Sequence, residues 1–431
     1  MHVEQQQAAR AVHAVLGGTS LRAALAAVDD GKVTRGRTLV AELAYGTLRH
    51  YGTLDALAHR LAAKPITDPL LGTLLCVALY QLAHTRAPPF AVVDRAVDAA
   101  AALVRPAAKA WINALLRRYL RERDALDAAV LGDSVARWSY PRWWIARVKA
   151  DHPAHWQAIL AAGNLRAPLT LRANVRVGSR AALVATLQAA GVNATAAGAQ
   201  GVVVVPPGAV DALPGYAEGA FCVQDLGAQI AAPLLGVADG MRVLDACAAP
   251  GGKATHLLEL ADVELTAIDS DPARLARIRD NLARLRLDDR GARIAQGDAG
   301  APDRWWDGQP FDRVLADVPC SASGVVRRHP DAKWLRRAGD MAGFCDEQDR
   351  VLDGLWPLVA RGGKLLYATC SVFAAENEAR LAAFIPRHPD ALRETITFPE
   401  GAAHDGGQLL PSSEAPGHNQ DGFFYALLRK A

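Results

Sequence analysis

The chain has 431 residues, of which 51% are hydrophobic and 22% are charged. This length exceeds that of one ordinary compact core, so we expect two or three domains, and the composition excludes a disordered chain. No charge-free apolar stretch reaches the roughly 18 residues that a membrane span needs, and the polar start Met1–Arg10 lacks the pattern of a secretory signal. We therefore expect a cytoplasmic protein that does not contact a membrane.

The cysteines show neither a disulfide framework nor a metal-binding pattern. No two of them form a CxxC pair, and no Cys/His cluster has the spacing of zinc ligands. A large chain without an export signal is not expected to carry structural disulfides. We predict free thiols and no metal site for the six cysteines, which are Cys76, Cys222, Cys247, Cys320, Cys345 and Cys370.

Positive charge is concentrated in the first part of the chain. Residues 1–180 contain 24 Lys and Arg against 13 Asp and Glu, a net charge of +11, so the rest of the chain carries −8. A basic half joined to an acidic half indicates that the first half meets a polyanion. Solvated helix faces would give the same pattern, so the charge alone leaves both interpretations open.

Residues 1–140 have the apolar periodicity of helices. Apolar residues recur at three- and four-residue spacing in five segments, and Gly or Pro residues separate most of these segments. Short connections between such segments predict a compact all-α bundle. The segments are Ala8–Leu16, Leu39–Leu61, Leu70–Leu82, Val92–Val104 and Trp111–Leu120.

Residues 141–225 are predicted to form a small α+β module. An Arg- and Trp-rich stretch, Ser139–Trp144, opens this region, and Asn164–Asn174 has the pattern of a loop entering a strand. A helix near residues 180–190 and the strand Val202–Val205 follow. The module has a basic surface and is expected to act as a linker or as an RNA-binding element.

From residue 226 to 431 strand and helix patterns alternate, which predicts an α/β domain with a parallel, doubly wound sheet. Asp271 and Pro272 are suited to begin a helix as its cap and first-turn residue. The apolar segment Gly422–Leu428 is expected to add a last, antiparallel strand. The other strands are predicted at Arg242–Ala246, Glu264–Asp269, Arg293–Gln296, Arg313–Asp317 and Lys364–Thr369, and the helices at Ala254–Leu260, Pro272–Leu285, Glu347–Val359 and Ala375–Ile385.

The segment Val243–Lys253 predicts a ligand site between a strand and a helix. Open α/β sheets bind ligands at the carboxyl ends of their strands, where Gly251 and Gly252 would let backbone approach a ligand closely. The segment is neither GxGxxG nor a P-loop, which disfavours a pyrophosphate or triphosphate. Asp269 ends the next strand 18 residues after Gly251, the position from which an acid hydrogen-bonds ribose, and Asp298 is placed to contact adenine. Together these residues predict an adenosine-type ligand.

Two further strands each deliver a cysteine to the same edge of the predicted sheet. Asp317 is followed by Cys320, and Thr369 is followed by Cys370. A lone cysteine is usually a small buried core residue. A cysteine at a strand end above a cofactor site is a better candidate nucleophile. The other four cysteines lack these companions and are interpreted as structural.

Taken together, the motifs Ala249–Lys253, Asp317–Ser321 and Thr369–Ser371 resemble those of the RNA cytosine-C5 methyltransferase family. Val318 departs from the family loop, which usually has Ala at this position. The resemblance covers essentially the whole chain and is strongest to bacterial members that act on 16S rRNA and carry a bundle similar to the antitermination factor NusB. Its further matching segments are Tyr80–Leu82, Pro88–Val97, Trp111–Arg118, Arg327–Trp334 and Asp421–Tyr425.

The resemblance implies the domain organisation and the cofactor. It implies a NusB-like RNA-binding domain at 1–140, a small module at 141–225 and a Rossmann-like class I methyltransferase domain at 226–431. The implied cofactor is S-adenosylmethionine. The residues that would bind it are Cys247, Ala248, Ala249, Pro250, Gly251, Gly252, Lys253, Asp269, Asp298 and Asp317.

The resemblance also implies the reaction. Cys370 would add to carbon 6 of cytosine, Cys320 would assist product release, and Asp317 would hydrogen-bond the N3/N4 edge of the base. We add the hypothesis that Lys253 is the cation that stabilises the Cys370 thiolate. The expected substrate is 16S rRNA, at the site conventionally called cytosine 967, and the expected state of the protein is a monomer.

A basic segment follows the Cys320 loop and is expected to hold RNA phosphates. A solvated helix face is the alternative interpretation of this segment. The basic residues concerned are Arg327, Arg328, Lys333, Arg336 and Arg337.

Three rival functions remain open at this level. The first is a tRNA cytosine-C5 methyltransferase, because the motifs do not name the RNA. The second is a DNA cytosine methyltransferase with Cys320 as nucleophile, which the presence of Cys370 disfavours. The third is a non-catalytic RNA-binding or antitermination protein, in which intact Gly251, Gly252 and Asp269 would be unnecessary.

Overall fold

The computed structural model describes residues 3–29, 34–399, 404–412 and 419–431. The chain folds as two compact units, one formed by Met1–Leu165 with Val326–Ala338 and the other by Arg166–Val325 with Gly339–Ala431. These compact units divide the chain at other residues than the three predicted domains, whose boundaries stay a prediction. Residues 141–165, expected in the middle module, belong to the helical unit, and so does the basic segment that follows the Cys320 loop.

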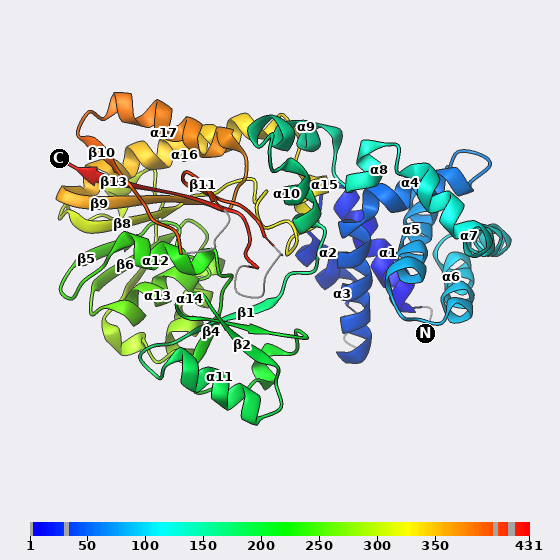
Figure 1. The fold of residues 1–431 in the computed structure, drawn as a ribbon, viewed down its shortest axis with the longest axis horizontal. Coiled ribbons are helices and arrows are strands. Elements are labelled where there is room, and N and C mark those ends of the chain that lie inside the picture. The colour runs from blue at the N-terminus through cyan, green and yellow to red at the C-terminus, as the bar shows by residue number, and fades with distance from the viewer. Residues whose placement is uncertain (1–2, 30–33, 400–403, 413–418) are drawn as a thin grey trace. The chain divides into compact units, whose positions relative to one another are not determined.

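The first unit is all-α, as predicted (Figure 1). Its helices up to residue 138 share one apolar core, against which Trp334 and Leu335 also pack. The periodic segment Leu39–Leu61 is two helices, because the backbone leaves helical geometry at His50. The helices α2, α8, α9, α10 and α15 were not predicted. The helices are α1 (Val3–Leu16), α2 (Leu21–Val28), α3 (Thr34–Arg49), α4 (Tyr51–Leu61), α5 (Pro69–His84), α6 (Pro89–Leu103), α7 (Ala108–Val130), α8 (Ser134–Trp138), α9 (Arg142–Asp151), α10 (Trp156–Gly163) and the short α15 (Ala332–Leu335).

The second unit begins with a small antiparallel sheet whose strand order is β2-β3-β1-β4. Helix α11 covers one face of this sheet, and Leu183 and Leu187 on that helix share an apolar cluster with the strands. This arrangement confirms the predicted α+β module. Its elements are β1 (Leu169–Ala173), α11 (Arg180–Ala189), β2 (Ala194–Ala197), β3 (Gly201–Val204) and β4 (Phe221–Val223).

A nine-stranded sheet forms the rest of this unit, with the path β11-β12-β13-β9-β8-β5-β6-β7 and β10 paired with β13. Neighbouring strands from β7 to β9 are parallel, and β13 runs antiparallel to β9, as predicted for the last strand. All five predicted parallel strands are present, and β9 begins earlier than expected. The strands are β5 (Arg242–Asp245), β6 (Glu264–Asp269), β7 (Arg293–Gln296), β8 (Phe311–Asp317), β9 (Val359–Thr369), β10 (Ala391–Glu394), β11 (His404–Asp405), β12 (Gln408–Leu409) and β13 (Phe423–Lys430).

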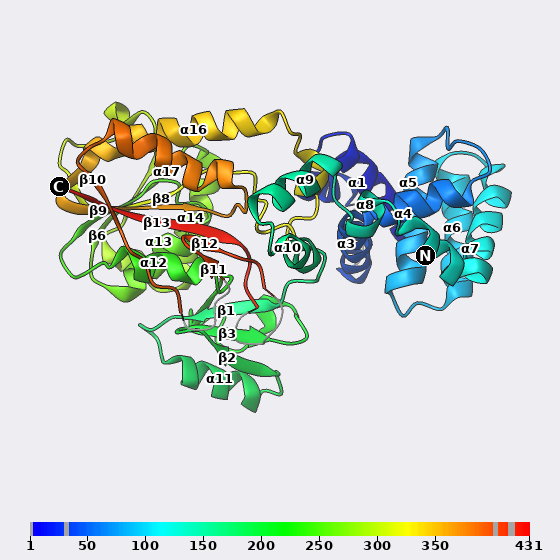
Figure 2. The same cartoon turned by 45° about the horizontal axis from the view of Figure 1, so that its top comes forward.

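Helices cover both faces of the large sheet (Figures 1 and 2). Those on one face share an apolar cluster with the strands, and α16 and α17 share a second cluster on the other face. Asp271 caps α14 by accepting a hydrogen bond from Ala273 N at 2.9 Å, as predicted. The helices are α12 (Ala231–Leu235), α13 (Gly252–Leu260), α14 (Pro272–Arg284), α16 (Asp340–Leu355) and α17 (Glu378–Phe384).

Within the described ranges, no helix is long and apolar enough to cross a membrane. The same residues contain no group of three or more His, Cys, Asp or Glu side chains that is placed to hold a metal ion. All six cysteines are free thiols.

Candidate active site

The turn between β5 and α13 is held by the end of the neighbouring strand. Gly251 has a φ of +100°, and a Cβ at this position would lie 3.2 Å from Ile278 Cα, so the turn requires glycine here. Asp269 at the end of β6 is buried and accepts hydrogen bonds from Ala249 N at 3.2 Å and Asp271 N at 3.1 Å. The structure therefore brings the predicted glycine turn and the predicted ribose-binding acid together.

Two cavities meet at this turn, and Cys247 contributes to both. One has a volume of about 200 Å³ and includes Asp269, Asp298 and Pro319 in its wall. The other has a volume of about 180 Å³. Its wall is formed by Val223, Gln224, Ala228, Asp245, Cys247, Ala248, Ala249, Pro250, Gly252, Lys253 and Asp317.

Asp245, which ends β5, is a buried carboxyl group in the wall of the second cavity. Only 1% of the residue is exposed, and neither of its carboxylate oxygens has a hydrogen-bond partner among the described residues. Burial and then the nearby charge of Asp317 raise the pKa of Asp245 to about 7. A buried acid without a partner is a candidate for binding a cationic ligand.

Lys253 and Asp317 form an ion pair in the same wall, in which the Lys253 ammonium donates to a carboxylate oxygen of Asp317. Burial opposes the charge on Lys253. The charge and hydrogen bond of Asp317, followed by the charge of Cys370, nevertheless hold the Lys253 pKa above its usual value. Lys253 is therefore a cation, and Asp317 is its direct partner.

The two predicted cysteines lie side by side. Cys320 Sγ and Cys370 Sγ are 3.3 Å apart, at the carboxyl ends of the adjacent parallel strands β8 and β9. The hydrogen bond with Cys370, followed by burial, raises the pKa of Cys320 well above its usual value. Cys320 therefore keeps its proton near neutral pH and is able to donate it towards Cys370.

Glu376 joins the loops that carry the two cysteines. Its side chain is fully buried and accepts hydrogen bonds from Ser321 N at 2.7 Å, from Ser321 Oγ at 2.5 Å and from Ser371 Oγ at 2.5 Å. Each of these serines directly follows one of the cysteines. Gln348 also donates to Glu376, at 3.1 Å, so the carboxylate is enclosed by donors. Glu376 thus fixes the backbone behind both thiols.

Asp298 is exposed and is oriented by a residue that the sequence did not single out. Arg350 on α16 donates to both of its carboxylate oxygens, at 3.0 Å and 2.8 Å. The hydrogen bond from Arg350 lowers the pKa of Asp298, so this acid stays ionised at the rim of the first cavity.

Val318 does not line either cavity. Its side chain is buried in the apolar cluster beneath α16 and α17, while its backbone N–H donates to Ala368 O at 3.1 Å. The departure from the usual Ala therefore changes the packing of the core rather than the walls of the cavities.

Two of the five basic residues expected to hold phosphates are instead buried in the helical unit. Lys333 is 0% exposed, and its Nζ donates to Arg49 O at 2.7 Å and to Asn164 Oδ1 at 2.8 Å. Arg327 is 2% exposed. We correct the expectation for Lys333 and Arg327, because a side chain enclosed by protein does not reach an RNA backbone.

The other three basic residues are Arg328 and Arg336, which are half-buried, and Arg337, which is exposed. These residues remain candidates for contact with phosphates.

Sequence reasoning missed Asp245, Glu376 and Arg350 as members of the site. A signal existed for Asp245, which is the last residue of the strand before the glycine turn. No local pattern marks Glu376 or Arg350, because each acts through a partner that is distant in sequence.

Three family matches divide the chain. Residues 2–121 match the NusB family, residues 140–211 match the ferredoxin-like domain of RsmF/B-like methyltransferases, and residues 232–429 match the family described as 16S rRNA methyltransferase RsmB/F. Similar solved structures include PH0851, with a TM-score of 0.79 at 24% identity over 100% of this chain and 99% of that chain. NSun6 from Pyrococcus horikoshii with SFG has a TM-score of 0.59 at 21% identity over 67% of this chain and 98% of that chain. At these identities the two structures show the shared fold.

Curated relatives match over nearly the full length. Ribosomal RNA small subunit methyltransferase B of Pseudomonas putida is 45% identical over 98% of this chain and 97% of that protein. The protein of the same name from Vibrio cholerae is 41% identical over 98% of this chain and 96% of its own length. With this identity, this coverage and the geometry of the paired cysteines, the chain belongs to the ribosomal RNA small subunit methyltransferase B (RsmB) family of methyltransferases.

Proposed function

We propose that this protein transfers a methyl group from S-adenosylmethionine to carbon 5 of a cytosine in 16S rRNA. The observation that carries the proposal is the pair of thiols, Cys320 and Cys370, with Sγ atoms 3.3 Å apart. They stand at the sheet edge that also carries the cavities and the Lys253–Asp317 ion pair. The names of the curated relatives support rRNA as the substrate class.

The residues around the cavities fit S-adenosylmethionine. The unpartnered carboxylate of Asp245 suits the ammonium group of its methionine part, and the turn at Gly251 admits backbone close to a ligand. Asp269 and Asp298 suit the ribose and the adenine. The residues that would hold the cofactor are therefore Cys247–Lys253 with these acids. When bound, S-adenosylmethionine supplies an electrophilic methyl group.

Carbon 5 of cytosine is a weak nucleophile, and the paired cysteines are arranged to activate it. The Cys370 thiolate would give an electron pair to carbon 6 and form an S–C bond, which moves the π electrons of the ring to carbon 5. After carbon 5 has gained its methyl group, it would give its remaining proton to solvent water. The electrons of the C–H bond then restore the ring double bond as the S–C6 bond breaks.

For the neighbouring residues we propose the roles that the family resemblance implies. Cys320 lies against the attacking sulfur and would assist this release step. Asp317 would hydrogen-bond the N3/N4 edge of the base, while Lys253 orients Asp317 and keeps positive charge near Cys370. The target base must leave any stack to reach these groups.

The test is transfer of tritiated methyl from S-adenosylmethionine to protein-free 16S rRNA, to assembled small subunits and to bulk tRNA. Wild type, Cys370→Ala and Cys320→Ala are compared, and the labelled base is mapped. We expect carbon-5 label in 16S rRNA at the site called cytosine 967, no label with Cys370→Ala, and an accumulating protein–RNA adduct with Cys320→Ala.

Other outcomes would identify the rival functions. If only tRNA is labelled, the substrate is tRNA instead of 16S rRNA, and the proposed cytosine-C5 methylation still stands. A covalent adduct on Cys320 in the Cys370→Ala protein would reverse the roles of the cysteines. Tight RNA binding without transfer to any of these RNAs would favour a non-catalytic protein.

A further inference from the structure

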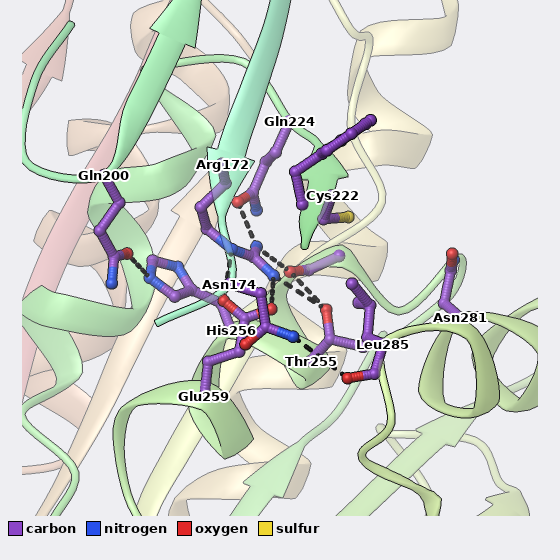
Figure 3. Close-up of polar contacts among 12 residues, drawn as sticks. Arg172, Asn174, Gln200, Cys222, Gln224, Thr255, His256, Glu259, Asn281 and Leu285 are labelled. Carbon is purple, nitrogen blue, oxygen red and sulfur yellow. Dashed lines mark hydrogen bonds and ion pairs between the residues drawn. The ribbon is translucent and has the colours of Figure 1, made fainter. Parts of the chain in front are cut away.

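A buried ion pair joins the small sheet to the helix that follows the glycine turn (Figure 3). Arg172 on β1 and Glu259 on α13 both have fully buried side chains. Arg172 donates from Nε to one Glu259 oxygen at 2.9 Å and from a terminal nitrogen to the other oxygen at 2.7 Å. This two-point geometry fixes the position and the plane of the guanidinium.

The remaining donors of Arg172 reach the cofactor turn. One terminal nitrogen donates to Gly252 O at 2.6 Å and also to the side-chain oxygen of Gln224. The other donates to Thr255 Oγ1 at 3.1 Å. Gly252 is the first residue of α13, and Gln224 directly follows β4. One buried guanidinium therefore connects the glycine turn with the end of the small sheet.

Gly252 and Gln224, which accept from the same terminal nitrogen of Arg172, both belong to the wall of the 180 Å³ cavity. Asp245 and Lys253 belong to the same wall. Val223 of β4 belongs to the same wall. The small sheet, which the sequence predicted to be a linker or an RNA-binding element, thus completes a cavity of the methyltransferase domain. The place of Val223 in the cavity wall is observed separately from the Arg172–Glu259 ion pair.

We propose that Arg172 is a positioning residue for the cofactor: it holds Gly252 and Gln224 in the geometry that binds S-adenosylmethionine. The inference rests on the proposed function, since it assigns Arg172 to the same cofactor site. The small sheet would accordingly be required for cofactor affinity in addition to any contact with RNA.

The test is calorimetric binding of S-adenosylhomocysteine to the full chain. The main variant is Arg172→Met with Glu259→Leu, because replacing both partners of a buried pair by apolar residues is often tolerated. We expect its Kd to rise about tenfold, as the loss of a charge-assisted hydrogen bond at the turn predicts. The KM for S-adenosylmethionine should rise with it, while kcat at saturating cofactor stays within about threefold of wild type.

Arg176→Met is the matched control. Arg176 also joins the small sheet to α13, but it donates to Glu259 O at 3.0 Å and to Asp262 at 3.0 Å, near the far end of the helix. It does not line the cavity. A purely structural role of this interface predicts that both variants lower the melting temperature and leave the Kd unchanged. Arg172→Lys, which keeps the charge but not the planar fork, should raise the Kd even if the double variant does not fold.

The outcomes separate the two proposals. A wild-type Kd in the folded double variant or in Arg172→Lys would overturn the role of Arg172 and leave the proposed function intact. An equal rise of the Kd in Arg176→Met would also overturn it. A wild-type protein that binds no S-adenosylhomocysteine and transfers no methyl group would remove the proposed function, and the role of Arg172 with it.

Discussion

Asp245 gives the wall of the 180 Å³ cavity a carboxyl group whose pKa is raised into the neutral range. Burial, and after it the charge of Asp317, raise the pKa of Asp245 to about 7, whereas an aspartate in an unfolded chain ionises near pH 4. Between about pH 4 and 7 the folded protein therefore holds a proton that the unfolded chain has released. Through this side chain, the free energy of unfolding falls as the pH rises across that window.

Asp245→Asn should remove this dependence. We expect the ligand-free variant to lose the decline in the free energy of unfolding between about pH 4 and 7, measured by urea unfolding at several pH values. In wild type, S-adenosylhomocysteine should bind more tightly as the pH rises towards 7 and should displace a proton, because its ammonium group favours the ionised acid. Asp280→Asn, on the exposed face of α14, is the control. Identical pH profiles for the two variants would contradict this account of Asp245.

Glu376 holds the serines that follow Cys320 and Cys370 by accepting hydrogen bonds from both of them. Glu376→Gln keeps the size of the side chain but removes the negative charge of the carboxylate, which accepts hydrogen bonds from Ser321 and Ser371. We expect the single-turnover methylation rate to fall roughly 10- to 100-fold, because small displacements of reacting groups have effects of this size. The Kd for S-adenosylhomocysteine should not change, because Glu376 lines neither cavity.

Glu378→Gln is the matched control for this prediction. Glu378 pairs with Arg393 on the surface of the same unit, with oxygen–nitrogen distances of 2.6 Å and 2.7 Å, and should tolerate the change. Equal methylation rates in the two variants would show that Glu376 does not hold the cysteines in place.

At the scale of elements, α15 and its flanks show how one basic segment divides into two roles. Lys333 lies over the Tyr140 ring, 4.3 Å from its centroid, and burial lowers its pKa well below the usual value. Arg337, four residues later, is exposed. Their difference in burial predicts that Arg337, and not Lys333, contacts RNA.

Salt dependence of RNA binding measures this difference. Arg337→Gln should reduce the slope of log affinity for 16S rRNA against log salt concentration by roughly 0.7–0.9, the effect of one lost phosphate contact. Lys333→Met should leave the slope unchanged, with both proteins confirmed as folded by circular dichroism. A reduced slope in Lys333→Met would return this residue to the RNA-binding surface.

At the scale of the whole molecule, the chain passes between its two units three times, after Leu165, after Val325 and after Ala338. It leaves the second unit after Val325, shortly beyond Cys320, and returns at Gly339. Between these points the chain packs with the helical unit. Trp334 donates from Nε1 to Leu48 O at 2.7 Å, and Asp331 accepts from Leu21 N at 3.0 Å.

Hydrogen exchange of the full chain tests this division. Saturating S-adenosylhomocysteine should protect the amides of β5 and α13, because ligand binding stabilises the unit that contains the site. The amides of residues 332–336 should exchange at the rate of the neighbouring α1 and α3 and should not respond to the ligand. Protection of residues 332–336 in step with β5 would assign this segment to the second unit.

The sequence determined the features that depend on local periodicity and on turn geometry. The alternation of apolar segments predicted each parallel strand of the large sheet, and Asp271 with Pro272 marked the start of α14 correctly. Because parallel strands end at one edge of a sheet, the motifs around Gly251, Cys320 and Cys370 also predicted that these residues would meet there.

Only the tertiary structure decided the features that depend on contacts between distant residues. The burial of Lys333 depends on Arg49 and Asn164, and the role of Glu376 depends on serines in two separate loops. Arg172 has the sequence context of any basic residue in a strand, and its contacts with Glu259 and Gly252 arise 80 or more positions away. The free energy of a charged group is set by the atoms around it after folding, and no local pattern in a single sequence specifies those atoms.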